Sequence, residues 1–293
     1  MSQPIILTDL DNTVYNWVDF FGPSFRAMVH ALAKELPFSE DYIIQDFKNL
    51  YAKHSSVEYP FAIQELEMCK GMPPTKVERL VRYGRAAFSM ARKKNLKPYD
   101  DVKETLHWAA RAGILIVGVT NSPLYQAEMR LRQLNLDPLF TGLAGWDTHE
   151  IPKDDYPWLN EIRKKAENGH YKSEIKRKWA LSTEELKPSP MGYLRILDDL
   201  HISHKETYVI GDSLHKDVGP AVEIGANGIL ATYGQRYDPK NFETLLKITH
   251  WNKDKIAAVY NDQSVVPTFT VNSFSELKGI VQPYQLVFEE LFA

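Results

Sequence analysis

The sequence has little cysteine and lacks any long hydrophobic run. Its one cysteine, Cys69, cannot form an internal disulfide, so we expect a protein of a reducing compartment. A membrane-spanning helix needs roughly 18 consecutive apolar residues, whereas the longest obvious run, residues 114–119, has only the length of a strand. No apolar segment of signal-peptide length fits before Asp9. These absences predict a cytoplasmic protein with no membrane partner.

An excess of positive charge is also missing. The 293 residues carry 35 lysines and arginines against 38 aspartates and glutamates, a net charge of −3, which speaks against a general nucleic-acid binder. The absence of a Gly-x-x-x-x-Gly-Lys-Ser/Thr loop excludes a nucleoside triphosphatase of that type. The 15 glycines and 17 prolines form no repeats, so fibrous and disordered classes are excluded as well.

What the sequence does contain is a series of short apolar runs separated by helical patterns. The runs lack strict alternation with polar residues, as expected of strands buried on both faces of a parallel sheet. Strands that alternate with helices predict an α/β fold with a doubly wound, Rossmann-like sheet. The five expected strands cover residues 5–10, 114–120, 208–211, 229–233 and 269–271.

A long helical stretch interrupts this alternation after the first strand. Apolar residues from Phe21 to Leu36 recur at the spacing of one helix face, and similar patterns continue to Met90. We therefore expect residues 15–97 to form an inserted helical domain, and residues 1–14 and 98–293 to form the α/β core. Two polar stretches, at about 147–185 and 236–264, are expected to be insertions in that core, and residues 270–291 one more strand and helix.

Polar and charged residues follow several of the expected strands. Asp9 and Asp11 follow the first strand, Thr120 and Asn121 end the second, and Asp212 follows the strand at 208–211. The carboxyl ends of parallel strands form the ligand-binding edge of such a sheet. Asp217, five residues after Asp212, and Lys187, before a later helix, are predicted to join the same site.

Four carboxylates at one edge would repel one another without a cation. Hard oxygen donors at this density suit Mg²⁺, and neither cysteine nor histidine is placed to select a softer metal. The sequence predicts a magnesium site made by Asp9, Asp11, Asp212 and Asp217. A zinc site formed by His201, His204 and His215 is disfavoured, because no further ligand has suitable spacing.

These residues resemble the four motifs of the haloacid dehalogenase superfamily, in order along the chain. Asp-Leu-Asp-Asn-Thr at 9–13 is similar to the first motif, and Thr120 closes the second. Lys187, in Leu-Lys-Pro-Ser-Pro, matches the third, and residues 211–218 match the fourth. The chain is most similar to the phosphatase branch that has a helical cap after the first motif, as in phosphoglycolate phosphatase-like proteins.

The resemblance implies a role for the first two motifs. Asp9 would be the nucleophile, which forms an aspartyl-phosphate and also binds Mg²⁺. Asp11 would protonate the leaving alkoxide and later activate water, and its backbone carbonyl would contact the metal. Thr120 would hold a phosphoryl oxygen. Dehalogenase members lack the second aspartate and the metal, so Asp11 favours a phosphatase.

The resemblance also implies roles for the later motifs. Lys187 would offset negative charge on the phosphate and the nucleophile, Asp212 would bind the metal directly, and Asp217 would act through water or by orienting Lys187. The 65 positions from Ser122 to Lys187 exceed what a simple helix and strand require, so Lys172 or Lys178 stays open as an alternative to Lys187.

The predicted function is hydrolysis of a small phosphate monoester, with Mg²⁺ as cofactor. Tyr15 and Trp17, which follow the first motif, and Asn121 are candidate substrate-binding residues. A phosphomutase or phosphotransferase with the same intermediate, or a binding protein that keeps the fold, stays open. Phosphoglycolate-like acids, sugar phosphates and nucleoside monophosphates are all open as substrates, and the oligomeric state is not readable from the sequence.

Overall fold

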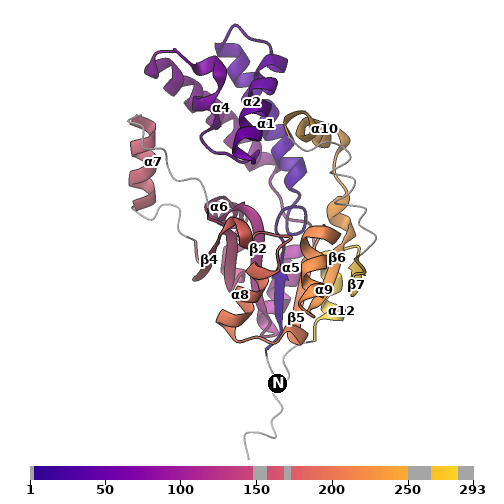
Figure 1. Cartoon of the computed structure of the whole chain (residues 1–293). Helices are drawn as coiled ribbons and strands as arrows, with labels where there is room; N and C mark the ends of the chain where they lie inside the picture. Colours follow the sequence, from indigo (N-terminus) through magenta and orange to yellow (C-terminus); the bar gives the residue numbers. More distant parts are fainter. Residues whose placement is uncertain (1–2, 148–156, 168–172, 250–264, 283–293) are drawn as a thin grey trace, which may run out of the picture.

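A parallel β-sheet forms the centre of the molecule, and a group of helices lies beyond one edge of it (Figure 1). We analysed a computed structural model, which describes residues 3–147, 157–167, 173–249 and 265–282. Seven strands are described, in the spatial order β4-β3-β2-β1-β5-β6-β7, and every pairing is parallel. Their bounds are β1 Ile5–Thr8, β2 Leu115–Pro123, β3 Gly142–Trp146, β4 Arg177–Leu181, β5 Thr207–Gly211, β6 Asn227–Ala231 and β7 Phe269–Val271.

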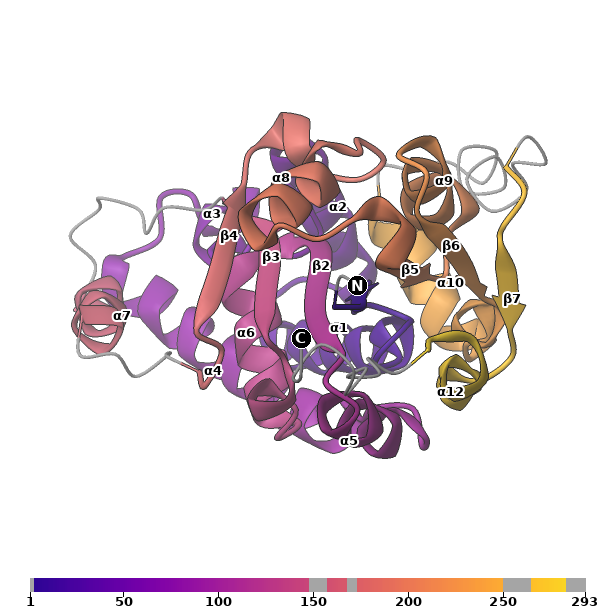
Figure 2. The ribbon, with the colours of Figure 1, turned by 90° about the horizontal axis from the view of Figure 1, so that it is seen from below.

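Helices cover both faces of the sheet (Figure 2). Because side chains alternate along a strand, Ile6 of β1 packs in the core beneath α5, α6 and α12, whereas Ile5 and Leu7 pack with α8 and α9. The predicted doubly wound α/β fold is confirmed. The covering helices are α5 Val102–Arg111, α6 Leu124–Gln133, α8 Met191–Leu200, α9 Gly219–Glu223 and α12 Leu277–Ile280.

The chain between β1 and β2 forms a helical unit, defined here as residues 17–95. Its main helix, α1, begins at the cap residue Asn16, whose side chain accepts a hydrogen bond from Asp19 N. The helix packs against α4, where Leu32 lies beside Gly84, and against α2, where Phe25 contacts Phe47. The two ends of the unit meet, because Tyr15 forms an isolated β-bridge with Pro98. The unit contains α1 Trp17–Glu35, α2 Glu40–His54, α3 Ala62–Glu65 and α4 Pro74–Asn95.

Two strands depart from the sequence prediction. Residues 142–146 were not expected to form a strand, and residues 177–181 were expected to lie in an insertion, yet they form β3 and the edge strand β4. Trp179 of β4 is buried, and its Nε1 donates to Asp199 Oδ2 at 2.6 Å. Helix α7 (Pro157–Glu167) precedes β4, and its Trp158 Nε1 donates to Gln64 Oε1 at 3.1 Å.

The second expected insertion, 236–264, contributes helix α10 (Pro239–Ile248). The helix lies beside α1 and α2 of the helical unit, away from the sheet (Figure 1). Residues 250–264 of this stretch, and most of the helix expected before 291, lie outside the described residues. No described helix combines the length and the apolar character needed to span a bilayer.

Candidate active site

The loop after β1 places two aspartates at the carboxyl edge of the sheet. Asp9 N donates to Ile210 O of β5 at 2.8 Å, so the chain is still held to the sheet where the Asp9 side chain leaves it. Asn12 then adopts a left-handed conformation (φ 61°), and its Oδ1 accepts from Trp17 N at 3.0 Å and Val18 N at 3.3 Å. This reversal of direction starts α1 directly above the site.

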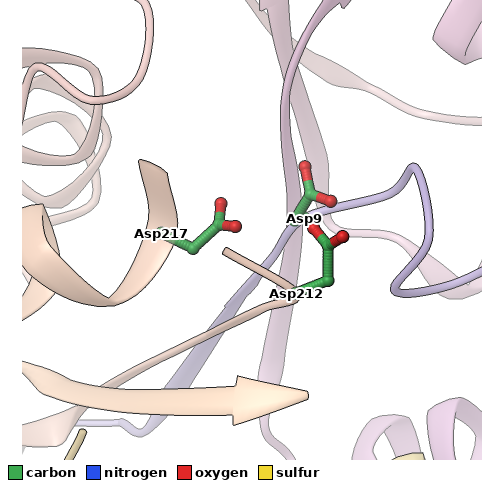
Figure 3. A group of neighbouring side chains, drawn as sticks. All are labelled: Asp9, Asp212 and Asp217. Atoms are coloured by element: carbon green, nitrogen blue, oxygen red, sulfur yellow. The ribbon is translucent and has the colours of Figure 1, made fainter. Parts of the chain in front are cut away.

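Three buried carboxylates meet at this edge: Asp9, Asp212 and Asp217 (Figure 3). Each offers one oxygen, and these oxygens all lie within 4.8 Å of one another. Gly211 is required here, because a Cβ atom at its position would overlap the Asp217 carboxyl group. Oxygen donors of this charge and spacing fit a hard divalent cation such as Mg²⁺.

The electrostatics of this cluster favour a bound cation. Burial raises the pKa of Asp9 to about 7, with Asp217 and Asp11 adding to the shift and Lys187 opposing it. Burial, and then Asp9 and Asp217, hold the pKa of Asp212 well above its ordinary value. A divalent cation among these oxygens would reverse the effect, because an opposite charge nearby stabilises the ionised carboxylate.

Lys187 supplies the positive charge of the cluster. Its Nζ donates to Asp9 Oδ1 at 2.5 Å and to Asp217 Oδ1 at 2.6 Å. Burial disfavours the charged amine, but the two carboxylates outweigh burial and hold the pKa of Lys187 well above its ordinary value. The two alternatives lie elsewhere: Lys178 pairs with Glu128 beside the edge strand, and Lys172 lies outside the described residues.

Asn121 fixes the backbone of Lys187. Its Nδ2 donates to Lys187 O at 2.7 Å, and its Oδ1 accepts from Lys187 N at 2.9 Å. These two hydrogen bonds join the end of β2 to the loop before α8. Although Asn121 lines the cavity described below, its amide is already engaged by Lys187.

Asp11 belongs to a second network, which joins the core to the helical unit. Its Oδ1 accepts from Arg130 Nη1 at 3.1 Å, and its Oδ2 lies 2.6 Å from the Ser122 hydroxyl. Glu58, from the loop between α2 and α3, pairs with the same Arg130 and lies 2.7 Å from the same hydroxyl through Oε2. Trp17 Nε1 donates to Glu58 Oε1 at 2.8 Å.

A cavity of about 310 Å³ opens above the carboxylates. Its floor comes from the sheet edge and carries every charged lining residue except Glu58, and its walls come from the helical unit and α10. The floor residues are Asp9, Asp11, Asn12, Thr120, Asn121, Ser122, Lys187, Asp212, Ser213, Lys216 and Asp217. The wall residues are Trp17, Val18, Ser55, Ser56, Val57, Glu58, Phe242, Leu245 and Thr249.

The structure brings most of the predicted site residues to this one cavity. Thr120 is buried on the floor, where its Oγ1 accepts from Ser122 N at 3.0 Å, and Trp17 lies on the wall. Tyr15 is the exception: its side chain is fully buried in the core and does not line the cavity. The backbone of Tyr15 pairs with Pro98 where the helical unit joins the core, and its buried hydroxyl lies near Asp11 and Arg130.

Sequence reasoning did not single out Arg130 and gave Ser122 no role. It named the loop of residues 53–60, which contains Glu58, as a segment able to reach the site, but it gave Glu58 itself no role. A signal for Arg130 was present, because it lies three residues after Ala127, on the predicted apolar face of the helix. A buried cation on such a face implies a buried anion nearby. The loop of residues 53–60 does reach the cavity, where Ser55, Ser56, Val57 and Glu58 line it.

Comparisons with known proteins agree with this geometry. A family model for haloacid dehalogenase-like hydrolases matches residues 4–225. Among curated proteins, no sequence matches the chain significantly. A 2-haloacid dehalogenase structure from Pseudomonas syringae pv. Tomato is 14% identical, with a TM-score of 0.57, and the match covers 95% of this chain and 97% of that one.

Two further structures share the fold at low identity. A HAD phosphatase from Thermococcus onnurineus is 17% identical, with a TM-score of 0.54 and coverage of 97% and 100% of the two chains. A HAD-hydrolase from Bacillus subtilis, in a structure bound to magnesium, is 14% identical, with a TM-score of 0.52 and coverage of 96% and 100%. The family model spans most of the sheet and the helical unit together. The chain therefore belongs to the haloacid dehalogenase-like hydrolase family.

Proposed function

We propose that this hydrolase cleaves small phosphate monoesters through an aspartyl-phosphate formed on Asp9. The observation that carries the proposal is the arrangement around Asp9: a buried carboxylate bonded to Lys187, with Asp212 and Asp217 beside it and Asp11 two residues along the chain. A nucleophile, a candidate acid and a set of metal ligands thus share one cavity. Covalent catalysis divides one difficult displacement into two easier ones.

In the first step an Asp9 oxygen attacks phosphorus, and the bond from phosphorus to the ester oxygen breaks. Asp11 gives its proton to that oxygen, so the product leaves as a neutral alcohol. In the second step Asp11 takes a proton from water, and the water oxygen attacks phosphorus. Phosphate leaves, the Asp9 carboxylate is restored, and the proton on Asp11 is replaced.

Thr120 and Lys187 would hold the transferring group. The Lys187 ammonium and the Thr120 hydroxyl on the floor offer positive charge and a hydrogen bond to phosphoryl oxygens. Asp9, Asp212 and Asp217 would hold Mg²⁺, together with the Asp11 backbone carbonyl. When bound, the metal neutralises charge on the phosphoryl oxygens.

Support for phosphate esters over haloacids comes from the second aspartate and the acidic cluster. Hydrolysis of an ester needs a proton donor for the leaving oxygen, whereas release of a halide does not. Asp11 contributes to the floor of the cavity, and its side chain stays 22% exposed. The carboxylate cluster also needs a cation, which a displacement on carbon has no reason to employ.

The test is phosphate release from a panel of phosphate monoesters, with Mg²⁺ and with EDTA. We expect metal-dependent release by the wild type and its loss, by at least about 10³-fold, in Asp9→Asn. Asp100→Asn, an exposed aspartate far along the chain, serves as the control and should keep full activity. Equal release by Asp9→Asn and the wild type would exclude Asp9 as nucleophile.

The same assay separates hydrolysis from phosphoryl transfer. A phosphomutase returns the phosphoryl group to the substrate, so an isomeric ester would accumulate instead of free phosphate. Product analysis of each sugar phosphate in the panel therefore distinguishes the two activities. Absence of both products with every ester would contradict the proposal and leave a binding protein on the same fold.

A further inference from the structure

Helix α10 lies outside the residues that the family model matches, which end at 225. It follows β6 of the core, yet its hydrogen bonds go to α1 of the helical unit. Arg26 donates from Nη2 to Asn241 Oδ1 at 2.7 Å and from Nη1 to Thr244 Oγ1 at 2.6 Å. Asn241 Nδ2 donates in turn to Asp19 Oδ1 at 2.9 Å.

The two helices are also in backbone contact. A Cβ atom at Gly22 of α1 would lie 2.9 Å from Asn241 Cβ and 3.0 Å from Asn241 Cα, so only glycine permits this approach. Asp238 caps the start of α10, and its own N donates to Asp19 Oδ1 at 3.0 Å. The contacts of α10 with α1 are therefore specific and close, and α10 is fixed to the helical unit.

Two neighbouring faces of α10 make different contacts, one with α1 and one with the cavity. Asn241, Thr244 and Ile248 are buried, and the first two bond to α1. Phe242 follows Asn241 and Leu245 follows Thr244, and both are only partly buried and line the cavity above Asp9. The Phe242 ring stacks on Tyr237 at 4.7 Å between centroids, which fixes its orientation.

Five of the nine wall residues are apolar, and the polar ones are Ser55, Ser56, Glu58 and Thr249. Trp17 and Val18 of α1 and Val57 of the following loop share the wall with Phe242 and Leu245. Trp17 is held rigidly, since its ring stacks on Phe21 at 4.5 Å. The one acid on this wall, Glu58, is paired with Arg130. Such a surface stabilises an apolar group and disfavours a second negative charge.

We infer that Phe242 and Leu245 of α10 contact the alcohol part of the substrate, and that the preferred substrates are phosphate monoesters whose alcohol carries an uncharged apolar or aromatic group. This inference rests on the proposed function, because it places the phosphate on the floor at Asp9 and Lys187. It disfavours esters such as phosphoglycolate, whose carboxylate would face the apolar wall.

The first experiment compares kcat/KM for benzyl phosphate, methyl phosphate and phosphoglycolate. We expect the wild type to prefer benzyl phosphate. In Phe242→Ala and Leu245→Ala, kcat/KM for benzyl phosphate should fall about 10-fold further than for methyl phosphate, because a lost apolar contact of this size changes specificity by that order. Leu246→Ala, on the same helix but off the cavity wall, is the matched control.

The second experiment measures binding without turnover. Benzylphosphonate and methylphosphonate are titrated in the presence of Mg²⁺ into the wild type and into Phe242→Ala, with thermal melts to show that both are folded. Tighter binding of benzylphosphonate that depends on Phe242 supports the inference, even if no ester is hydrolysed and the proposed function fails. Hydrolysis with an unchanged benzyl-to-methyl ratio in both variants overturns the inference and leaves the proposed function intact.

Discussion

Arg130 has an unusual position for an arginine. Its side chain is 3% exposed and pairs with two carboxylates, Asp11 of the loop after β1 and Glu58 of the helical unit. Its guanidinium also lies 5.3 Å from the centre of the Phe20 ring. A buried charge pair adds little net stability, but removing one partner leaves a buried charge uncompensated. Arg130 is therefore a residue whose loss should be severe.

We predict that Arg130→Met lowers the free energy of unfolding by about 3–5 kcal/mol at neutral pH. The substitution leaves Asp11 and Glu58, which both contact the Ser122 hydroxyl, without their positively charged partner. Urea unfolding measures the effect. Arg132→Met, on the exposed face of the same helix, should change stability by less than about 0.5 kcal/mol. Adding Glu58→Gln to Arg130→Met should restore part of the loss. Equal effects of the two arginine variants would contradict this account.

The raised pKa of Asp9 predicts a pH dependence of stability without metal. Between its ordinary value of 3.8 and about 7, the folded protein holds a proton that the unfolded chain has lost. Stability therefore falls as pH rises through this window, by about 2 kcal/mol between pH 5 and 7 from Asp9 alone.

Urea unfolding at pH 5 and pH 7 in EDTA tests this dependence. Asp9→Asn should flatten the slope, and Mg²⁺ should offset the loss at pH 7 by binding the ionised carboxylates. Stability that rises from pH 5 to 7 in EDTA would show that Asp9 is ionised in the metal-free protein.

At this scale the sequence predicted the charged floor well and the walls poorly. Asp9, Thr120 and Asp212 were placed because each ends a recognisable strand. The pairing of Glu58 with Arg130 and the position of Phe242 could not be predicted, because they depend on how whole helices pack. Tyr15 does not line the cavity, because its place in sequence next to the loop after β1 does not fix which way its side chain points.

At the scale of elements, the loop before α8 depends on β2 for its position. Lys187 lies on that loop, and Asn121 at the end of β2 is bonded to both its backbone N–H and its backbone carbonyl. The lysine is thus placed by a side chain from another strand. This explains why the long separation of the two motifs in sequence does not separate them in space.

We predict that Asn121→Ala lowers kcat about 10- to 100-fold, because small displacements of a catalytic group have effects of this order. The KM for phosphate esters should change less, since Asn121 bonds to Lys187 and not to the substrate. Asn49→Ala, on the exposed side of α2, is the control. An effect confined to KM would instead indicate that Asn121 binds the substrate, as the sequence predicted.

The strands that the sequence missed have clear physical reasons. Strand β3 reads Gly-Leu-Ala-Gly-Trp, and its two glycines remove the β-propensity that marks a strand. Gly145 is needed there, because a Cβ atom would lie 2.9 Å from Leu124 Cα. Strand β4 is an edge strand whose charged residues, Arg177 and Lys178, are exposed, so its apolar signal is short.

At the scale of the whole molecule, α10 adds a connection between the helical unit and the core, besides the linkers at Tyr15 and Pro98 and the pair of Arg130 with Glu58. This connection is the contact between Gly22 and Asn241. Movement of the helical unit relative to the sheet therefore has to carry α10 with it or break these contacts. Both walls of the cavity would then move together.

We predict that Gly22→Ala destabilises the protein by up to about 2 kcal/mol. Alanine gains nearly 1 kcal/mol over glycine in a helix, but overpacking against the α10 backbone costs about 1–3 kcal/mol. Larger residues such as valine should have larger effects and should also impair turnover of benzyl phosphate. Gly279→Ala, whose Cβ would meet nothing within 4 Å, should be neutral or stabilising. Thermal melts of the three variants show whether each substitution stabilises or destabilises the protein.

The junction at Tyr15 and Pro98 has a consequence for the order of folding. Strand β1 pairs with β2 through Ile5 and Leu115, about a hundred residues apart, and closing so long a loop costs roughly 1.5 kcal/mol more than closing one of 20. Once the helical unit has folded, Tyr99 N donates to Val14 O and its two ends are already together. The long loop then becomes a short one. The helical unit can thus act as a folding template for the strand that carries Asp9, besides covering it in the native state.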